Sequence, residues 1–505
     1  MNARTLLGCC TALILAGCTA VGPDYQRPGI DLPDAFPPAT GSNTGAGLAI
    51  ALDAAWWKLP PGAGSKTGAD APVAIDAQWW RLYGDPVLDR LVDGALQRNA
   101  DIRLAVARIE EADANLREAG ATVLPQIDLG AAGSRAGVST TGATPLPPST
   151  PLIRNSVRIG ASTSFELDFW GRLRRAREAV RAQALGTRYA KDVVSQSLAG
   201  LTSQAYFTLR ALDVQLALTR EALALREEFL AIVRSRAAGG IASELEVGQS
   251  IVARADAAIL LRELQRQRTL IEHQLGNLSG TPDLALAQSA ALLDLPLPPV
   301  PPPGLPSSLL ERRPDIRQAE QLLISANAQI GVARAAMLPN ISLTGLFGAE
   351  SRALATLLEG GSNIWSIGFG LTLPIFDGGR LAARADAAQA RSQQALVGYQ
   401  KAIETAFREV ADALTNLAQT AAAERDLQER AGSARNTLRL ARTRYEAGYS
   451  AYLEVLDAQR TTTEAQLALV RNRQSRLAAS VDLMKSLGGG WSAQRPVAPA
   501  PTPAG

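Results

Sequence analysis

Residues 157–169 read VRIGASTSFELDF, and this stretch decides the fold because its side chains alternate in character. Odd positions from Val157 onward carry apolar residues or threonine, whereas even positions carry small, polar or charged residues. A period of two predicts a β-strand with two unlike faces. Strands of this length suit a wall that faces lipid on one side and water on the other. Residues 365–375 alternate in the same way, with even positions occupied by Ser366, Gly368, Gly370 and Thr372.

A half-buried sheet in a soluble protein gives the same alternation and is the commoner cause of it. An export signal and very long helices in the same chain favour the membrane here. Partner strands begin at Ile127 and Ile341, which follow Pro125 and Pro339. The sequence therefore predicts two β-hairpins, at about 124–169 and 338–376.

The strands belong to a longer unit that the sequence contains twice. Short motifs recur in the same order in both halves, which indicates an internal repeat. We place the first copy at residues 83–294 and the second at 307–491, with the proline-rich linker 295–306 between them. The paired motifs are Asp101-Ile102-Arg103 with Asp315-Ile316-Arg317, Leu124-Pro125 with Leu338-Pro339, Gly171-Arg172-Leu173 with Gly379-Arg380-Leu381, and Leu245-Glu246-Val247 with Leu453-Glu454-Val455.

Long helices follow each hairpin. Proline is absent from residues 171–280 and 375–495, and apolar residues recur there every three or four positions. The longest of these helices would extend about 100 Å at about 1.5 Å per residue, too far for a compact domain. They must therefore pair as antiparallel coiled coils that turn at glycines. The predicted helices are 172–237, 242–278, 380–447 and 450–487, each pair preceded by its hairpin and a further helix.

The composition excludes several classes of protein. Apolar residues make up 47% of the 505 residues and charged residues 20%, which excludes a disordered chain. A formal net charge of +3 leaves no excess for wholesale phosphate binding, so we expect no nucleic-acid partner. The single histidine, His273, has no second imidazole or thiol beside it, so we predict a surface residue and no metal site. Without a histidine base near a nucleophile, we expect neither an enzyme nor a cofactor.

The first residues predict export and lipid attachment. Arg4 precedes an apolar run that is too brief to span a bilayer, so residues 1–17 read as a signal peptide. This segment ends in Leu15-Ala16-Gly17, and Cys18 follows it. These four residues resemble the lipobox of bacterial lipoproteins, in which the cysteine is acylated. An ordinary signal peptide with an incidental cysteine is the alternative. Cys18 is the predicted lipidation site, and Thr19, by resemblance to lipoprotein sorting, favours the outer membrane.

Segments of biased composition flank the two repeats. Residues 18–82 are rich in proline, glycine and alanine and predict a lipid-anchored linker, whereas residues 492–505 predict a disordered tail. The linker contains a doubled segment with Trp56-Trp57 and then Trp79-Trp80. The sequence leaves open which tryptophan pair packs against the body.

Four strands cannot close a barrel around water, and open sheet edges are not tolerated in hydrocarbon. If the strands span a membrane, the chain must form an oligomer. Cyclic symmetry would close both the strands and the helices around one axis. The residues alone do not give the number of subunits.

Several motifs, in order, resemble the TolC-like outer membrane factor family, in its NodT-type lipoprotein branch. The resemblance implies a mainly α fold with a small membrane β part, in which a homotrimer forms a 12-stranded β-barrel continuous with a periplasmic α-helical barrel. It implies the exit channel of a tripartite efflux or secretion system for drugs or toxic compounds, with a periplasmic membrane-fusion adaptor and an inner-membrane pump of the RND type. The motifs are Val21-Gly22-Pro23-Asp24-Tyr25, Phe165-Glu166-Leu167-Asp168-Phe169-Trp170-Gly171, Arg312-Arg313-Pro314-Asp315-Ile316, Pro374-Ile375-Phe376-Asp377-Gly378-Gly379, Leu453-Glu454-Val455-Leu456-Asp457 and Leu487-Gly488-Gly489-Gly490-Trp491.

Candidate gate residues follow from the same resemblance. Glu454 and Asp457 lie three residues apart at the start of a predicted helix, and family acids at matching positions line the periplasmic constriction. A helix N-terminus that simply favours acidic residues is the alternative. Glu246 holds the matching place in the first copy. Tyr445 is predicted to hydrogen-bond a neighbouring helix or, equally, to pack as an ordinary side chain.

The two helical turns are the predicted adaptor contacts, with Gly239 and Gly240 in the first copy and Gly448 and Ser450 in the second. A different function also fits part of the pattern. A periplasmic coiled-coil structural lipoprotein or adhesin, without a pore, would need the helices. Such a protein has no need for lipid-facing strands in both copies, so the exit channel is the favoured prediction.

Overall fold

The computed structural model describes residues 20–29, 78–139, 151–289, 291–298 and 312–489. The chain forms two compact units. Among the described residues, the strand unit comprises 20–29, 108–139, 151–188 and 318–400, and the hairpin unit comprises 78–107, 189–289, 291–298, 312–317 and 401–489. The signal peptide, Cys18, Trp56-Trp57 and the tail lie outside the described residues.

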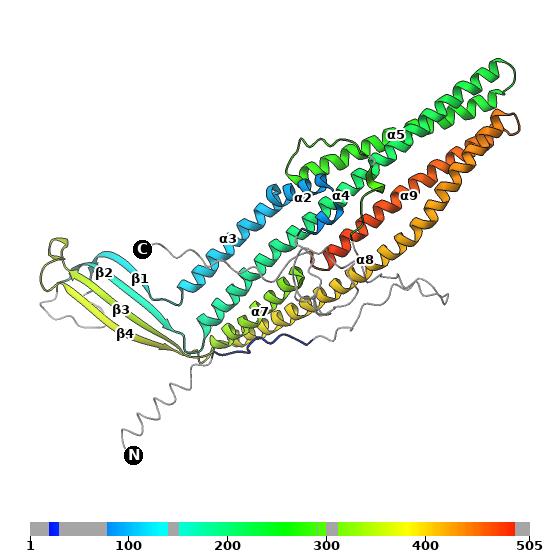
Figure 1. Ribbon diagram of the computed structural model, residues 1–505. Coiled ribbons are helices and arrows are strands. Elements are labelled where there is room, and N and C mark those ends of the chain that lie inside the picture. The colour runs from blue at the N-terminus through cyan, green and yellow to red at the C-terminus, as the bar shows by residue number, and fades with distance from the viewer. Residues whose placement is uncertain (1–19, 30–77, 140–150, 290, 299–311, 490–505) are drawn as a thin grey trace, which may run out of the picture. The chain divides into compact units, whose positions relative to one another are not determined.

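The strand unit contains one antiparallel sheet of four strands in the order β1-β2-β3-β4 (Figure 1). The strands are β1 (Gln126–Gly137), β2 (Ile153–Leu167), β3 (Asn340–Ser351) and β4 (Asn363–Thr372). Their register carries the sequence alternation across the sheet, since Ala161 is paired with Leu129 on one side and Phe347 on the other. Odd-numbered side chains therefore share one face, and even-numbered side chains share the other.

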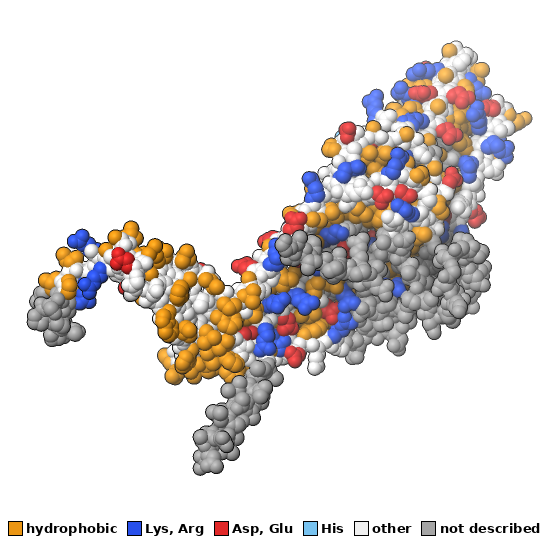
Figure 2. Space-filling view, turned by 60° about the vertical axis from the view of Figure 1, so that its left-hand side comes forward, with side chains coloured by type: hydrophobic (Ala, Val, Ile, Leu, Met, Phe, Trp, Pro, Cys, Tyr) orange, Lys and Arg blue, Asp and Glu red, His pale blue; other side chains and the backbone are white. Residues whose placement is uncertain are grey.

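The odd face of the sheet is apolar and uncovered in the single chain. Phe347, Trp365, Ile367 and Phe369 are each at least 70% exposed. Figure 2 shows hydrophobic side chains gathered over the sheet. The even face carries mainly glycine, serine and threonine, such as Gly160, Ser162 and Ser164 on β2. A sheet with one large exposed apolar face and one polar face has the composition of a lipid-facing wall.

The helices, like the strands, occur in two sets that follow the same order along the chain. α4 (Arg172–Ala238) and α8 (Arg380–Glu446) each have 67 residues, and each is followed by a shorter helix. No described helix is both long enough and apolar enough to cross a membrane. The remaining helices are the 3-10 helix η1 (Trp79–Tyr83), α2 (Pro86–Arg98), α3 (Ala100–Ala121), α5 (Glu244–Ser279), η2 (Ala291–Leu293), α7 (Pro314–Ala335), η3 (Leu354–Thr356) and α9 (Tyr452–Ser486).

Aspartates start both long helices where the sheet ends. Asp168 accepts hydrogen bonds from the N–H groups of Leu173 and Arg174. Asp377 accepts from the N–H groups of Leu381 and Gly379, and the Leu381 bond above all lowers the pKa of its carboxyl. Carboxylates at these positions satisfy N–H groups that have no partner inside the helix. Each strand therefore passes into its helix through a defined cap.

Both described ends of the segment 18–82 pack against other parts of the chain. Near its start, Arg27 and Tyr25 both bond Glu320 of α7, the arginine at 2.6 Å. Near its end, Trp79 and Trp80 belong to the largest core cluster, where Tyr83 contacts Phe207 of α4 with ring centroids 4.8 Å apart. Burial of large aromatic rings outweighs the local bias toward loop composition. Trp79-Trp80 is thus a pair that packs.

A buried ionic cluster fastens the segment that follows α5 to the first hairpin. Asp213 of α4 accepts from Arg210 at 3.1 Å, from Arg268 of α5 at 2.8 Å and from the N–H of Ser289 at 3.1 Å. Arg268 also donates to the carbonyl of Leu286 at 2.6 Å. The Asp213 side chain is 1% exposed. Two helices and the following segment therefore share one buried carboxylate.

Candidate functional site

The candidate site lies at the turns of the two helical hairpins, both in the hairpin unit. α4 turns into α5 through Gly240, with φ +76°, and α8 turns into α9 through Gly448, with φ +81°. Backbone with positive φ favours glycine because a side chain would be strained there. The predicted turns at Gly239, Gly240 and Gly448 thus lie where the helices end.

Near the turns, the two hairpins contact each other through an aromatic cluster of Phe229, Tyr445 and Tyr452. Its ring centroids lie 5.7–6.4 Å apart. Arg442 of α8 bonds Glu228 of α4 at 2.9 Å and lies 5.4 Å from the Phe229 ring centroid. The cluster joins α4 to α8 and α9, so it links the two repeats close to the turns.

Tyr445 is packed within this cluster rather than hydrogen-bonded. It is 5% exposed, and the Arg236 guanidinium lies 4.7 Å from its ring centroid. Among the described residues its hydroxyl has no hydrogen-bond partner. A buried hydroxyl without a partner costs about 1–3 kcal/mol. The hydrogen bond predicted to a neighbouring helix is thus not made within the described part of this chain.

The predicted acids differ in their surroundings. Glu454 is exposed in the first turn of α9 and makes no ion pair with the described residues. Asp457 is also exposed but bonds Arg460 at 2.9 Å, and Arg460 bonds Glu464 at 3.0 Å. Glu246 is half-buried in the first turn of α5, where its N–H donates to the Ser243 hydroxyl. Of the three predicted acids, only Asp457 thus has an ion pair among the described residues.

The turns predicted as adaptor contacts, residues 238–243 and 447–451, and the helix starts after them carry exposed apolar residues that the sequence analysis did not single out. Ile241 is 79% and Leu245 is 70% exposed, and the equivalent residues of the second copy, Tyr449 and Leu453, are 80% and 60% exposed. An alignment of the two repeats could have indicated these residues, because both turns carry apolar residues at matching positions. Ser450, a predicted contact, is only half-exposed, with its hydroxyl oxygen buried.

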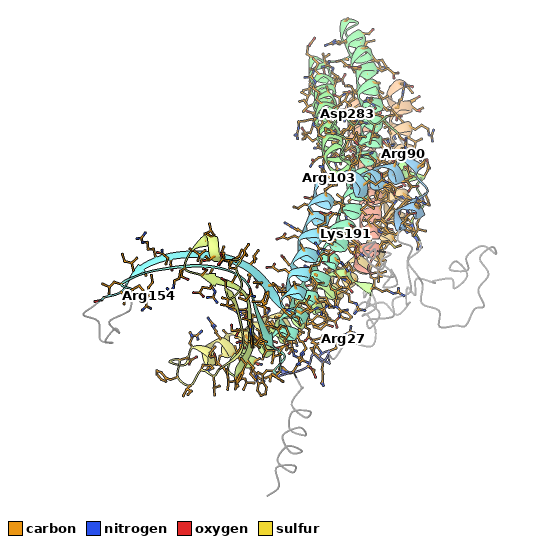
Figure 3. All side chains as sticks on the ribbon, turned by 90° about the vertical axis from the view of Figure 1, so that its left-hand side faces the viewer. Arg27, Arg90, Arg103, Arg154, Lys191 and Asp283 are labelled. Carbon is orange, nitrogen blue, oxygen red and sulfur yellow. The ribbon has the colours of Figure 1, made fainter. Side chains whose placement is uncertain are left out.

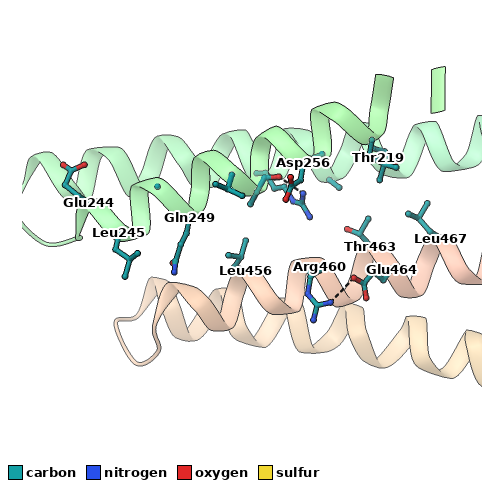
Figure 4. A pocket seen from close by; sticks show the side chains of 17 residues that line it. Thr219, Glu244, Leu245, Gln249, Asp256, Leu456, Arg460, Thr463, Glu464 and Leu467 are labelled. Carbon is teal, nitrogen blue, oxygen red and sulfur yellow. Dashed lines mark hydrogen bonds and ion pairs between the residues drawn. The ribbon is translucent and has the colours of Figure 1, made fainter. Parts of the chain in front are cut away.

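A groove of about 740 Å³ runs between the first hairpin and α9 (Figure 4). Apolar side chains such as Leu245, Val252 and Leu456 line it, with Arg460 and Glu464 on the α9 side. Arg226 lies on the α4 side and donates to the Ala253 carbonyl at 2.6 Å. Burial lowers the pKa of its guanidinium. The groove therefore combines an apolar lining with a partly buried guanidinium group, that of Arg226.

Nothing in the described residues gathers the ligands of a metal. No group of three or more His, Cys, Asp and Glu side chains suited to a metal occurs there, and His273 is exposed on α5. The described chain instead offers a sheet with a bare apolar face and paired hairpins with apolar turns. An uncovered apolar sheet face of this kind is typical of a membrane-facing wall.

Comparison with known proteins gives the family. The model of the outer membrane efflux protein family matches residues 91–281 and 305–489. The chain belongs to this family. It is an outer membrane protein that functions in efflux, and the family comprises channels rather than enzymes. The structural lipoprotein or adhesin without a pore is therefore not supported.

Individual relatives cover nearly the whole chain. Outer membrane protein OprJ of Pseudomonas aeruginosa is 36% identical over 492 residues, which is 96% of this chain and 95% of the relative. The solvent efflux pump outer membrane protein SrpC of Pseudomonas putida is 34% identical over 491 residues, 95% of this chain and 97% of the relative. The structure of the CmeC outer membrane channel of Campylobacter jejuni has a TM-score of 0.81 at 26% identity, covering 95% of this chain and 96% of that one.

Proposed function

We propose that three copies of this chain form the exit channel of a tripartite efflux system. The observation that carries the proposal is the four-stranded sheet, whose apolar face is bare and whose edges are β1 and β4. An unpaired edge in hydrocarbon costs several kcal/mol for each polar group, so β1 of one copy pairs with β4 of the next. Three copies give a closed barrel of 12 strands, wide enough for a water-filled lumen.

The even face of the sheet then lines the lumen, and the long helices continue as an α-helical barrel in the periplasm. Cys18 carries the lipid that anchors the chain to the outer membrane. A periplasmic adaptor and an inner-membrane pump of the RND type deliver drugs or other toxic small molecules. This assembly is supported by the relatives, which include a solvent efflux pump component.

The mass of the detergent-extracted protein tests the assembly. We expect three chains per particle and ion conductance across a planar bilayer. A stable monomer would contradict a closed barrel, because a single sheet leaves both edges open.

The gate of this channel lies where the helical turns approach the threefold axis. Glu454 of each copy faces the constriction and forms a ring of three carboxylates, which attracts cations. Asp457 contributes less, because Arg460 neutralises much of its charge. The aromatic cluster and the Arg442–Glu228 pair hold the hairpins of each copy together in the closed state.

Charge variants at the gate are expected to change ion selectivity in opposite directions. Glu454→Gln removes the uncompensated charge and should lower the cation-to-anion permeability ratio about two- to threefold. Arg460→Gln frees the Asp457 carboxylate and should raise the same ratio. Reversal potentials in asymmetric salt measure both. The exposed Glu429→Gln on α8 is the control, and equal effects of all three variants would reject the ring.

The exposed apolar residues of both turns form the adaptor contact. A photo-reactive residue in place of Tyr449 should form an adduct with a membrane-fusion adaptor in living cells. Leu453→Ser should weaken that contact by about tenfold, because it removes an apolar anchor of roughly 1.5 kcal/mol or more. Ile259, 66% exposed and farther along α5, is the control position for both changes. An adduct that persists fully in Leu453→Ser would place the contact elsewhere.

A further inference from the structure

The even face of the sheet is its concave face where Gly160 of β2 meets Gly348 of β3. An ideal Cβ placed on Gly348 would lie 2.2 Å from the carbonyl oxygen of Ile159 and 2.5 Å from the Cα of Gly160. Cβ directions that converge in this way mean that β2 and β3 fold toward their even-numbered side chains. In a closed barrel the concave face is the inner one, so even-numbered residues line the lumen.

The lumenal face becomes basic at its outer end. β2 leads at Leu167 into the cap of α4, so its other end, near Arg154, is the end away from the helices. Figure 3 labels Arg154 at this end of the sheet. Arg158 is paired with Glu350 of β3, a carboxylate that also accepts a hydrogen bond from Ser156 at 2.9 Å. Arg158 therefore has a nearby opposite charge.

Arg154 has no such compensation. Its register partner is Ala136, its side chain is exposed, and it makes no ion pair with any described residue. The carboxylate of Glu350 also lies at this end of the even face, where it accepts from Ser156 and is in register with Arg158. The positive charges of Arg154 and Arg158 together exceed the single negative charge of Glu350. The even face of β2 and β3 is therefore net positive at this end in each chain.

We propose that Arg154, with Arg158 behind it, forms a basic ring at the outer mouth of the channel that favours the exit of anionic solutes. The inference rests on the trimeric barrel of the proposed function, which repeats Arg154 three times around the axis. A ring of like charge at a water-filled opening raises the local concentration of counter-ions. It acts separately from the acidic ring proposed at the helical turns.

The reactivity of a cysteine placed beside the ring reports the electrostatic potential there. The measurement does not require the gate to open. Ser134 faces the same side of β1, between the register partners of Arg158 and Arg154. Ser134→Cys is treated from outside with a negatively charged and a positively charged methanethiosulfonate, and the two reaction rates are compared. The protein without this change gives the background, since Cys9 and Cys10 leave with the signal and Cys18 is acylated.

Arg154→Gln in the Ser134→Cys protein should lower the ratio of anionic to cationic rates by about fivefold at low salt, with a smaller effect in high salt. Arg135→Gln is the matched control, because Arg135 lies at the same level of β1 on the opposite face, paired with Asn155. For a trimeric protein, three results would overturn the basic ring. The rate ratio could be unchanged by Arg154→Gln, it could change equally with Arg135→Gln, or the introduced cysteine of Ser134→Cys could react with neither reagent. A monomeric particle would instead overturn the proposed function itself.

Discussion

Gly348→Ala is expected to prevent most of the protein from reaching its folded, membrane-inserted form. The added methyl group would meet the backbone of Ile159 and Gly160 at 2.2–3.0 Å, and a backbone cannot move aside as a flexible side chain can. β2 and β3 would have to separate, which breaks ladder hydrogen bonds between two strands of a sheet whose other face meets lipid. The cost is about 3 kcal/mol or more. The fraction of heat-modifiable, detergent-resistant oligomer on gels measures the loss.

Gly130→Ala is the matched control for this variant. Gly130 lies in the same row of the sheet, paired with Gly160, yet a Cβ there meets no atom within 4 Å. We expect the control to assemble like the parent protein. If Gly348→Ala assembles equally well, then the close approach of the two strands does not limit folding, and the concave even face loses its main support.

Asp213→Asn is expected to give the largest loss of stability in the hairpin unit. The substitution keeps the shape of the side chain but removes the charge that Arg210 and Arg268 share. Arg268 keeps Glu272 at 2.9 Å, whereas Arg210 loses its carboxylate partner. Removing one partner of a buried ionic cluster typically costs about 3–5 kcal/mol. Thermal unfolding followed by circular dichroism should show a clearly lower melting temperature.

Hydrogen exchange separates this mechanism from a general weakening. Residues 281–289 are held through the carbonyls of Leu286 and Ala287 and the N–H of Ser289, so their amides should exchange faster in Asp213→Asn than the rest of the unit. Glu221→Gln, an exposed change on the same helix, should leave both measurements unaltered. Unchanged exchange in 281–289 would mean that the cluster does not fasten this segment.

Much of the candidate site could be predicted because its signals are local. The turns follow from glycines between proline-free stretches, and the Asp457–Arg460 pair follows from spacing of three residues on one helix. That pair was available to sequence reasoning and was missed. The exposed residues Leu245 and Leu453 were also within reach, since the two repeats match there.

Other parts of the site have no local signal. Tyr445 contacts Phe229, which is far away in the chain, and no sequence pattern around either residue predicts this contact. Asp213 and Arg268 are 55 residues apart, and each stands among many charged residues that remain in water. The concave face likewise depends on which glycines become neighbours across strands.

The sequence by itself determined the periodicities: strands with a period of two, long proline-free helices, the order of both repeats and the positions of the turns. These features follow from backbone geometry and side-chain polarity, which act over a few residues. Only the tertiary structure decided that the described ends of residues 18–82 pack, that Tyr445 joins an aromatic cluster, that Asp213 is shared by two arginines and that Arg154 makes no ion pair with the described residues. Burial and charge pairing depend on distances in space, and the chain fixes those distances only when distant segments meet.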